Sequence, residues 1–172
     1  MTRTGYITAT AAAAGASSLW ASTVVPSTPA ASDPNSVELG VKFRSDVSGK
    51  IKSIRFYKPS TNTGTHTGSL WTSTGTLLGR ATFTETASGW QQVNFATPIA
   101  ITANTVYVAS YHTSSGHYAA TRAVFTTAGI DKAPLHALAG TNGVYAYGTS
   151  SAFPNASYQA SNYWVDVIFA PN

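Results

Sequence analysis

The chain has 172 residues, of which 43% are hydrophobic and 12% aromatic, so it is long enough to bury the core of one domain. Only 9% are charged, against about 25% in an ordinary soluble protein. The exposed surface must therefore consist mainly of Ser, Thr, Asn, Gln and Gly, which argues against a helical protein. The absence of cysteine excludes disulfides, thiolate metal sites and a cysteine nucleophile.

The beginning of the chain differs in composition from the rest. Residues 1–17 are rich in Ala and Thr, and we interpret them as an extended N-terminal arm before a single domain at 18–172. The apolar run at 11–14 is too short for a convincing secretory signal, and no stretch is long enough to span a membrane. Residues 18–36 are rich in Pro, Ser and Ala and are expected to form an extended loop along a sheet edge.

From residue 37 onward, strand-like runs alternate with turn residues. Strands are expected at residues 37–43, 50–57, 68–73, 77–86, 90–96, 105–112, 117–120, 143–147 and 163–170. Many short strands with frequent turns predict an all-β fold, a two-sheet antiparallel β-sandwich of jelly-roll-like form.

The turn residues predict how neighbouring strands are joined. Hairpins are expected to close at residues 46–49, 73–76 and 87–89. Residues 128–138 are expected to hold one short turn of helix. The last strand is apolar on both faces except at Asp166, a pattern that favours a central strand covered on both sides.

Basic residues are concentrated in one part of the chain, where six of the ten fall between Lys42 and Lys58. We interpret them as the solvated side of a strand pair. The alternative is a patch for an acidic glycan, a membrane surface or nucleic acid. No nucleic-acid-binding motif accompanies the patch, so nucleic acid is not expected as a partner.

The inventory of reactive groups argues against catalysis. A glycosidase needs two carboxylates facing each other, and nothing in the sequence brings Glu85 and Asp131 together. The sequence contains no nucleophile elbow, zinc-protease motif, P-loop or dinucleotide fingerprint. We therefore predict that the protein is not an enzyme.

Aromatic and imidazole side chains near the later turns are candidates for sugar recognition. An exposed ring packs on the C–H face of a pyranose, while nearby polar groups bond its hydroxyls. Trp71, Trp90 and Trp164 lie inside strand patterns and are assigned to the core instead. The candidate glycan-binding residues are His66, His112, His117, Tyr118, Tyr145 and Tyr147.

Two candidate metal sites follow from the positions of histidines and carboxylates. His112 and His117 flank a Gly-containing turn and, with a carboxylate, could hold a metal; we favour their interpretation as polar loop residues. Glu38 in the first strand and Asp166 in the last are the candidate ligands of a structural calcium. The alternative is that such a carboxylate pairs with a basic neighbour. No other cofactor is expected.

The order of several motifs along the chain resembles a bacterial domain family of unknown function over about residues 18–170. The motifs that carry the resemblance are at 39–43, 54–58, 62–71, 75–78, 89–93, 107–112, 142–148, 153–154 and 162–167. Domains of this family occur in secreted bacterial proteins, beside immunoglobulin-like repeats and glycan-active or amidase-type domains. The resemblance implies a β-sandwich accessory module without established catalytic residues.

Two functions follow as expectations. The first is a structural or decoration protein on the surface of a bacteriophage particle, a minor capsid or tail-associated protein with a glycan-adhesive role. Its partners would be capsid or other virion proteins, or further copies bound through the arm. The alternative is a carbohydrate-binding accessory module, secreted or on the bacterial cell surface, whose partner is a cell-surface glycan. The expectation of glycan binding rests only on the domains that accompany this family in other proteins.

Overall fold

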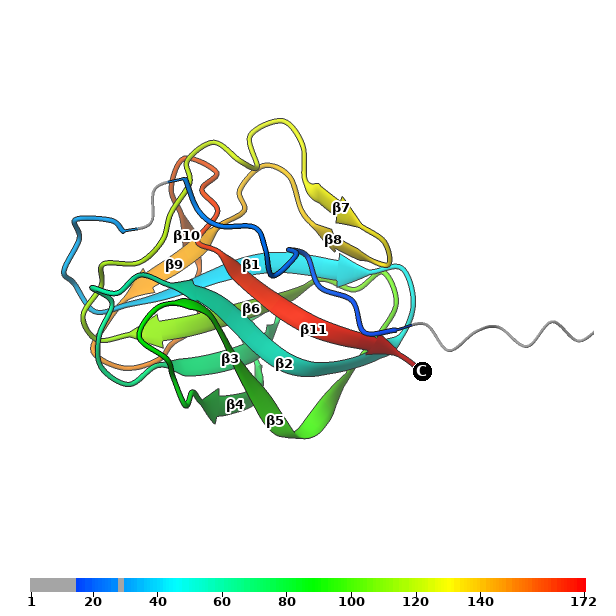
Figure 1. Ribbon diagram of the computed structural model, residues 1–172. Helices are drawn as coiled ribbons and strands as arrows, with labels where there is room; N and C mark the ends of the chain where they lie inside the picture. The colour runs from blue at the N-terminus through cyan, green and yellow to red at the C-terminus, as the bar shows by residue number, and fades with distance from the viewer. Residues whose placement is uncertain (1–14, 28–29) are drawn as a thin grey trace, which may run out of the picture.

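The computed structural model describes residues 15–27 and 30–172 and shows two antiparallel sheets packed face to face (Figure 1). The predicted all-β, two-sheet architecture is confirmed. Within the described part of the chain, no helix is long and apolar enough to cross a membrane. The strands are β1 (Val37–Ser45), β2 (Gly49–Lys58), β3 (Thr67–Thr72), β4 (Leu77–Thr82), β5 (Gly89–Ile101), β6 (Tyr107–Thr113), β7 (Ile130–Lys132), β8 (Leu135–Ala137), β9 (Val144–Tyr147), β10 (Ala156–Ser157) and β11 (Val165–Pro171).

The two sheets are of unequal size. The larger sheet has the order β10-β9-β1-β6-β3-β4, and β8, itself paired with β7, also pairs with β1. The smaller sheet has the order β11-β2-β5. Both β8 and β9 pair with β1, β8 at its C-terminal end and β9 at its N-terminal end.

The core lies between the sheets because strand residues alternate between two faces. In β1, Val37, Leu39, Val41 and Phe43 are buried in the main hydrophobic cluster. The alternate residues of β1, beginning with Glu38, therefore face the outer side of the large sheet. Strands β6 and β11 contribute Tyr111, Val165, Val167 and Phe169 to the same cluster.

The small sheet covers only part of the large one. The main contacts between the sheets join β11 to β1 and β6, β2 to β3 and β6, and β5 to β4. Strands β9 and β10 lie beyond this overlap, so loops pack against the inner side of β9 (Figure 1). Because the small sheet does not cover β9 and β10, the inner face of the large sheet has room for a pocket at this edge.

Two of the three predicted hairpins are wrong. The turn at 46–49 joins β1 to β2, and the turn before β5 follows β4, yet each pair lies in different sheets. Only the turn at 73–76 closes a true hairpin, between β3 and β4. Turn residues specify a reversal of the chain, but the reversed strand can pair in the same sheet or cross to the facing one.

Three further expectations are corrected. Residues 128–138 form the β7–β8 pair in place of a helical turn. Residues 117–120 are not a strand: His117 has a positive φ of 51°, which strand geometry excludes. The last strand, β11, is at the edge of the small sheet, and β2 is its central strand.

The described N-terminal segment lies against the edge strand β11. Ser17 forms an isolated antiparallel bridge with Phe169. The buried Asp166 carboxylate accepts hydrogen bonds from the backbone N–H groups of Leu19 and Trp20, at 2.8 and 3.3 Å. Because Leu19 is fully buried, residues 17–20 are part of the packed domain. Residues 1–14 of the predicted arm lie outside the described residues.

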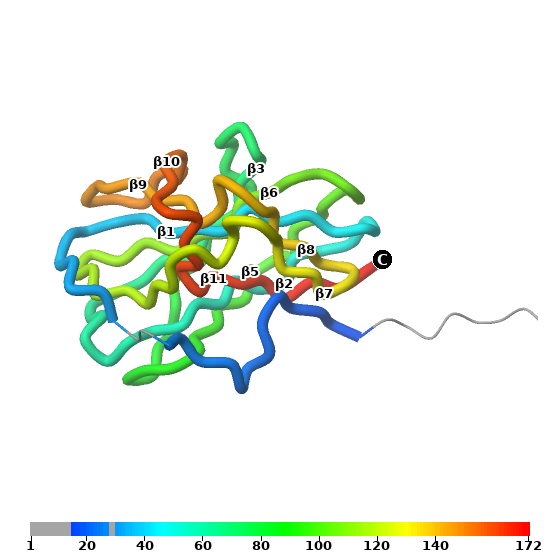
Figure 2. The backbone as a smooth tube through the Cα atoms, turned by 90° about the horizontal axis from the view of Figure 1, so that it is seen from above, coloured from blue at the N-terminus to red at the C-terminus, as the bar shows by residue number. Residues whose placement is uncertain are grey.

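The two ends of the described chain lie together. The segment that begins at residue 15 and the C-terminus are at the same end of the sandwich, as two views at right angles show (Figures 1 and 2). The tip of β9 and the loop that precedes β1 lie at the other end (Figure 1).

Candidate ligand-binding site

A cluster of tyrosines begins on β9, where the large sheet extends past the small one. Tyr145 and Tyr147 are opposite the core residues Leu39 and Val37 of β1, so both point to the inner side of the sheet. Their rings meet edge to face, with centroids 5.6 Å apart. Tyr163, just before β11, packs against Tyr145 at 6.4 Å.

These rings line an open pocket of about 460 Å³, a size within the usual range for small-molecule sites. Tyr147 and Tyr158 are 56% and 49% exposed, more than any other aromatic ring of the described residues. Exposed rings of this size at the rim of a pocket are available to a ligand. The lining residues, called here the tyrosine pocket, are Asp33, Asn35, Tyr118, Tyr145, Tyr147, Tyr158 and Tyr163.

The Asp33 carboxylate is the centre of the polar contacts in the tyrosine pocket. Its Oδ2 accepts hydrogen bonds from the hydroxyls of Tyr147 at 2.6 Å and Tyr118 at 3.2 Å. Its Oδ1 accepts from the backbone N–H and side-chain Nδ2 of Asn35, at 3.0 and 2.6 Å. Four donors occupy about four lone-pair positions, so the carboxylate has little capacity for a further hydrogen bond.

The charge of Asp33 is stable at neutral pH. Partial burial works to raise the pKa of Asp33, but hydrogen bonds from Tyr147, Asn35 and Tyr118 together hold it below its ordinary value. Conversely, donation to Asp33 raises the pKa of Tyr147, and burial, together with the nearby Asp33 charge, raises the pKa of Tyr118. The Asp33 carboxylate is thus charged at neutral pH, whereas Tyr118 and Tyr147 keep their protons.

Backbone contacts hold Asp33 in place. The His117 N–H donates to the Asp33 carbonyl oxygen at 2.7 Å, and the Ala31 N–H donates to the Tyr118 carbonyl at 2.8 Å. Gly116, with φ of +61°, allows this close approach, because a Cβ there would clash with the Asp33 carbonyl oxygen. The segment carrying the carboxylate is therefore fixed by the turn after β6.

Two further hollows adjoin the tyrosine pocket. One, of about 340 Å³, shares Asn35 and Tyr147 with it and continues past Gly148. The other, of about 610 Å³, shares Asp33 and Tyr118 and reaches the exposed Arg122. The tyrosine pocket therefore has a neighbouring hollow beside Tyr147 and another beside Tyr118.

The structure brings together three of the six predicted glycan-binding residues: Tyr118, Tyr145 and Tyr147. Two histidines lie close by without lining the tyrosine pocket. His112 Nε2 is 3.2 Å from Ser36 Oγ and 3.0 Å from the Gly148 carbonyl oxygen. His117 Nδ1 is 3.2 Å from the Ala31 carbonyl oxygen. The two imidazoles thus have separate backbone partners and form no shared metal site.

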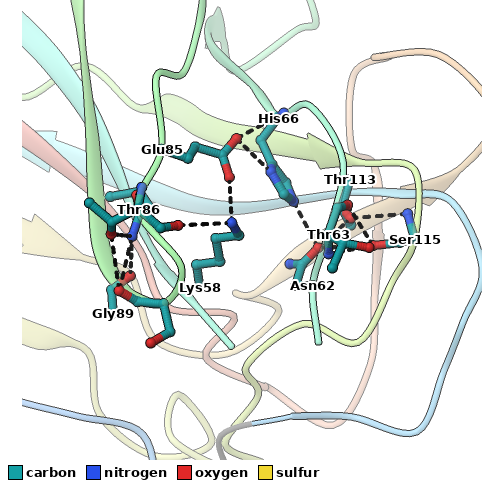
Figure 3. Close-up of polar contacts among 11 residues, drawn as sticks. Lys58, Asn62, Thr63, His66, Glu85, Thr86, Gly89, Thr113 and Ser115 are labelled. Carbon is teal, nitrogen blue, oxygen red and sulfur yellow. Dashed lines mark hydrogen bonds and ion pairs between the residues drawn. The ribbon is translucent and has the colours of Figure 1, made fainter. Parts of the chain in front are cut away.

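His66 belongs to a different, buried polar cluster (Figure 3). Its Nδ1 is 2.7 Å from Glu85 Oε1, and its Nε2 is 2.7 Å from Asn62 Oδ1. Lys58 Nζ is 3.0 Å from the second oxygen of Glu85, and Thr113 donates to Asn62 at 2.6 Å. Since the imidazole is fully buried and both nitrogens have protein partners, we assign this cluster to stability.

The electrostatics of His66 agree with that assignment. Burial lowers the pKa of His66, although the hydrogen bond and charge of Glu85 oppose the shift. The Glu85 charge is balanced by Lys58, whose side chain is as buried as that of Glu85. The cluster therefore joins the end of β2 to the segments before β3 and after β4.

The structure does not bring the two candidate calcium ligands together. Asp166 lies on the outer face of the small sheet, where its partners are Leu19, Trp20 and Arg55. Glu38 lies on the outer face of the large sheet and accepts a hydrogen bond from Ser110. The prediction assumed that the first and last strands are neighbours, but they belong to different sheets.

Half of the candidate basic patch is used in ion pairs. Arg55 and Lys58 are largely buried and pair with Asp166 and Glu85. Arg44 pairs with Asp46 at 2.6 Å. Only Lys42, Lys50 and Lys52 remain among the six residues without an ion pair in the described chain. The residues therefore do not form one continuous anion-binding surface.

Sequence reasoning missed four residues of the tyrosine pocket: Asp33, Asn35, Tyr158 and Tyr163. The run Asp33-Pro34-Asn35 carries a recognisable turn signal, since the Asp33 side chain accepts from the N–H two residues on. That signal predicts a turn, but it does not predict which tyrosines will surround the carboxylate.

Comparison with known proteins gives a family and no activity. Residues 23–165 match the family model described as "Domain of unknown function (DUF4082)". The match covers most of the chain and includes every residue of the tyrosine pocket. A comparison with curated proteins found no match.

Proposed function

Since the chain belongs to the DUF4082 family, a domain family of unknown function, we propose its function from its own geometry. The protein is a non-catalytic carbohydrate-binding domain, and the tyrosine pocket is its site. The observation that carries the proposal is the pair of half-exposed rings, Tyr147 and Tyr158, beside the hydrogen-bonded carboxylate of Asp33.

The lining of the tyrosine pocket matches the two needs of sugar recognition. Tyrosine rings supply flat apolar surfaces for the C–H faces of a pyranose, and their hydroxyls exchange hydrogen bonds with sugar hydroxyls. Tyr145 and Tyr163 are held by edge-to-face packing against other rings. A site of this kind loses little conformational entropy when a ligand binds.

The tyrosine pocket supports binding more than catalysis. Glycoside hydrolysis commonly uses two carboxylic acid groups on either side of the scissile bond. Among the described residues that line the tyrosine pocket, Asp33 alone carries a carboxylate. Its four hydrogen bonds and lowered pKa suit a fixed charge better than a proton donor.

The test is a glycan array followed by calorimetric titration of the best oligosaccharide. Replacing Tyr147 or Tyr158 with Ala should weaken binding about five- to thirtyfold, as expected when a stacking ring worth about 1–2 kcal/mol is lost. Leu77→Ala is the control, because Leu77 is also exposed, at 42%, but lies on β4 away from the tyrosine pocket. Failure of every glycan to bind, or equal loss in the control, would reject the proposal.

The role of a phage decoration protein is a second proposal that is compatible with glycan binding. It is supported by the position of the chain ends, which lie together at the end of the sandwich away from the tip of β9 (Figure 1). Attachment at that end would leave the tyrosine pocket free. Native mass measurement of the source particle should find the protein there, and its absence from any particle would favour the secreted or cell-surface alternative.

A further inference from the structure

The tyrosine pocket has an unusual balance of charge and polarity. Five of its seven lining residues are tyrosines, and the remaining two are Asp33 and Asn35. No Lys, Arg or His is among these described lining residues, although the whole chain has a net charge of +4. The lining of the tyrosine pocket thus carries one negative charge and no positive charge, on a protein that is basic as a whole.

The rings and the carboxylate of the tyrosine pocket both attract a cationic ligand. The face of an aromatic ring is negative and attracts a cation. Asp33 adds a full negative charge that its hydrogen bonds keep ionised at neutral pH. Two tyrosine hydroxyls donate hydrogen bonds to this carboxylate, so toward a ligand these hydroxyls can act only as acceptors.

We propose that the tyrosine pocket binds an organic ammonium group carried by the glycan. The geometry points to this because five tyrosines line the same pocket as a carboxylate whose four hydrogen-bonding positions are taken by Tyr118, Tyr147 and Asn35. A saturated carboxylate attracts a cation by charge and needs no N–H donor from it. The inference rests on the proposed function, glycan binding in the tyrosine pocket, and adds that the bound sugar carries an ammonium group.

An ammonium group on a bacterial or environmental glycan has two chemical sources. One is an amino sugar with a free amine, and the other is a choline substituent. The neighbouring hollow that ends at Arg122 offers a cation for an acidic group next to the ammonium. Arg122 itself lies over the ring of Tyr158, 5.7 Å from its centroid, so this cation adjoins the tyrosine pocket on the side of Tyr158.

The experiment compares ligands of equal size and different charge. Glucosamine oligosaccharides, the same oligosaccharides fully N-acetylated, choline and phosphocholine are titrated into the intact protein at pH 7 by calorimetry and NMR. We expect at least one ammonium ligand to bind tenfold or more tightly than the neutral oligosaccharide. Preference for the glucosamine chain identifies the amino sugar as the source, and preference for choline or phosphocholine identifies the quaternary amine.

Asp33→Asn tests the charge with little change in shape. It should reduce the affinity for the ammonium ligand at least tenfold, and by a larger factor than it reduces any affinity for the neutral oligosaccharide. Asp131→Asn is the matched control, since Asp131 is an exposed carboxylate on β7 outside the tyrosine pocket. NMR spectra of both variants check that the fold is unchanged.

The outcomes separate this inference from the proposed function. Binding of the neutral oligosaccharide as tightly as its amine form, or full ammonium affinity in Asp33→Asn, overturns the ammonium inference and leaves glycan binding standing. Binding of choline, with no glycan bound either here or on the array, supports the ammonium site and rejects the glycan function. If none of these ligands binds, the ammonium inference is rejected, and the glycan array decides the proposed function.

Discussion

Glu38 is a fully buried carboxylate on the outer face of the large sheet. Ser110 donates to its Oε1 at 2.5 Å, and Trp71 Nε1 donates to Ser110 Oγ at 2.8 Å. Residues 151–154 cover this region, since Ser151 bonds Arg80 and Phe153 packs on Trp71. Burial raises the pKa of Glu38 to about 7, against the opposing hydrogen bonds and the charge of Arg80.

The raised pKa predicts a definite pH dependence of stability. The folded state holds the Glu38 proton more tightly than the unfolded state, so this contribution is complete below pH 4.5 and is lost as pH rises through 7. Glu38→Gln removes the charge and should stabilise the protein at pH 8, by up to about 3 kcal/mol if the whole shift is recovered. Urea unfolding at pH 5 and pH 8 measures the difference.

The control is Leu77→Ala, which alters an exposed side chain on β4 and changes no titratable group. The variant Glu38→Gln should show a smaller loss of stability between pH 5 and 8 than the wild type does. Asp166, whose pKa burial raises to about 6, contributes in the same direction and remains in both proteins. An unchanged pH profile in Glu38→Gln would mean that Glu38 is ionised in the fold at pH 5.

The turn after β6 links the fold to the tyrosine pocket. Its Gly116 has a positive φ and touches the backbone of Asp33, whereas a Cβ added at Gly140, also with positive φ, would have no neighbour within 4 Å. Gly116→Ala should therefore displace the segment that carries Asp33 and weaken ligand binding at least tenfold. Gly140→Ala should lose only about 1 kcal/mol of folding stability, because alanine adopts the positive φ with strain.

Calorimetric titration of the two glycine variants measures the affinity, and thermal unfolding measures the stability. The comparison isolates the contact with Asp33 because both positions have a positive φ that an alanine adopts only with strain. Equal affinity in Gly116→Ala and Gly140→Ala would show that the position of Asp33 does not depend on this turn.

The same elements show how far the sequence predicts this structure. Alternation of apolar residues predicts β1, β2, β3, β6 and β9 to within two residues at each end, because a strand with one buried face has a period of two. The assignment of strands to sheets cannot be read from the turns, and this is why β1–β2 and β4–β5 were predicted as hairpins.

The candidate site was predictable in part for a related reason. Tyr145 and Tyr147 alternate within a strand and must share a face, so the sequence places them together. Asp33, Tyr118 and Tyr163 join them only because β9 extends past the small sheet and three loops fill the space. That mismatch of the two sheets is a tertiary property with no local signal.

The whole molecule depends on its last strand to complete the small sheet. Strand β11 pairs with β2, contributes Val165, Val167 and Phe169 to the core, and holds residues 17–20 through Asp166. Removal of residues 165–172 should therefore prevent cooperative folding, because the remaining sheet has two strands and an uncovered core.

Circular dichroism and NMR measure the effect of this deletion. The control removes only Asn172, which is exposed and follows the strand. The shortened protein should give poorly dispersed NMR signals and no cooperative thermal transition, while the control keeps both. A sharp transition in the longer deletion would show that the large sheet is stable without β11.

The bridge between Ser17 and Phe169 also fixes how the domain can be tethered. Residue 15 and the C-terminus lie at one end of the sandwich and the tip of β9 at the other (Figures 1 and 2), so linkers joined to the domain at residue 15 or at the C-terminus leave from the same end. Fluorescent tags or immobilisation surfaces placed there should leave ligand affinity unaltered. Many copies fixed on one support would point their tyrosine pockets outward, so weak single-site binding would add up to strong adhesion through multivalency.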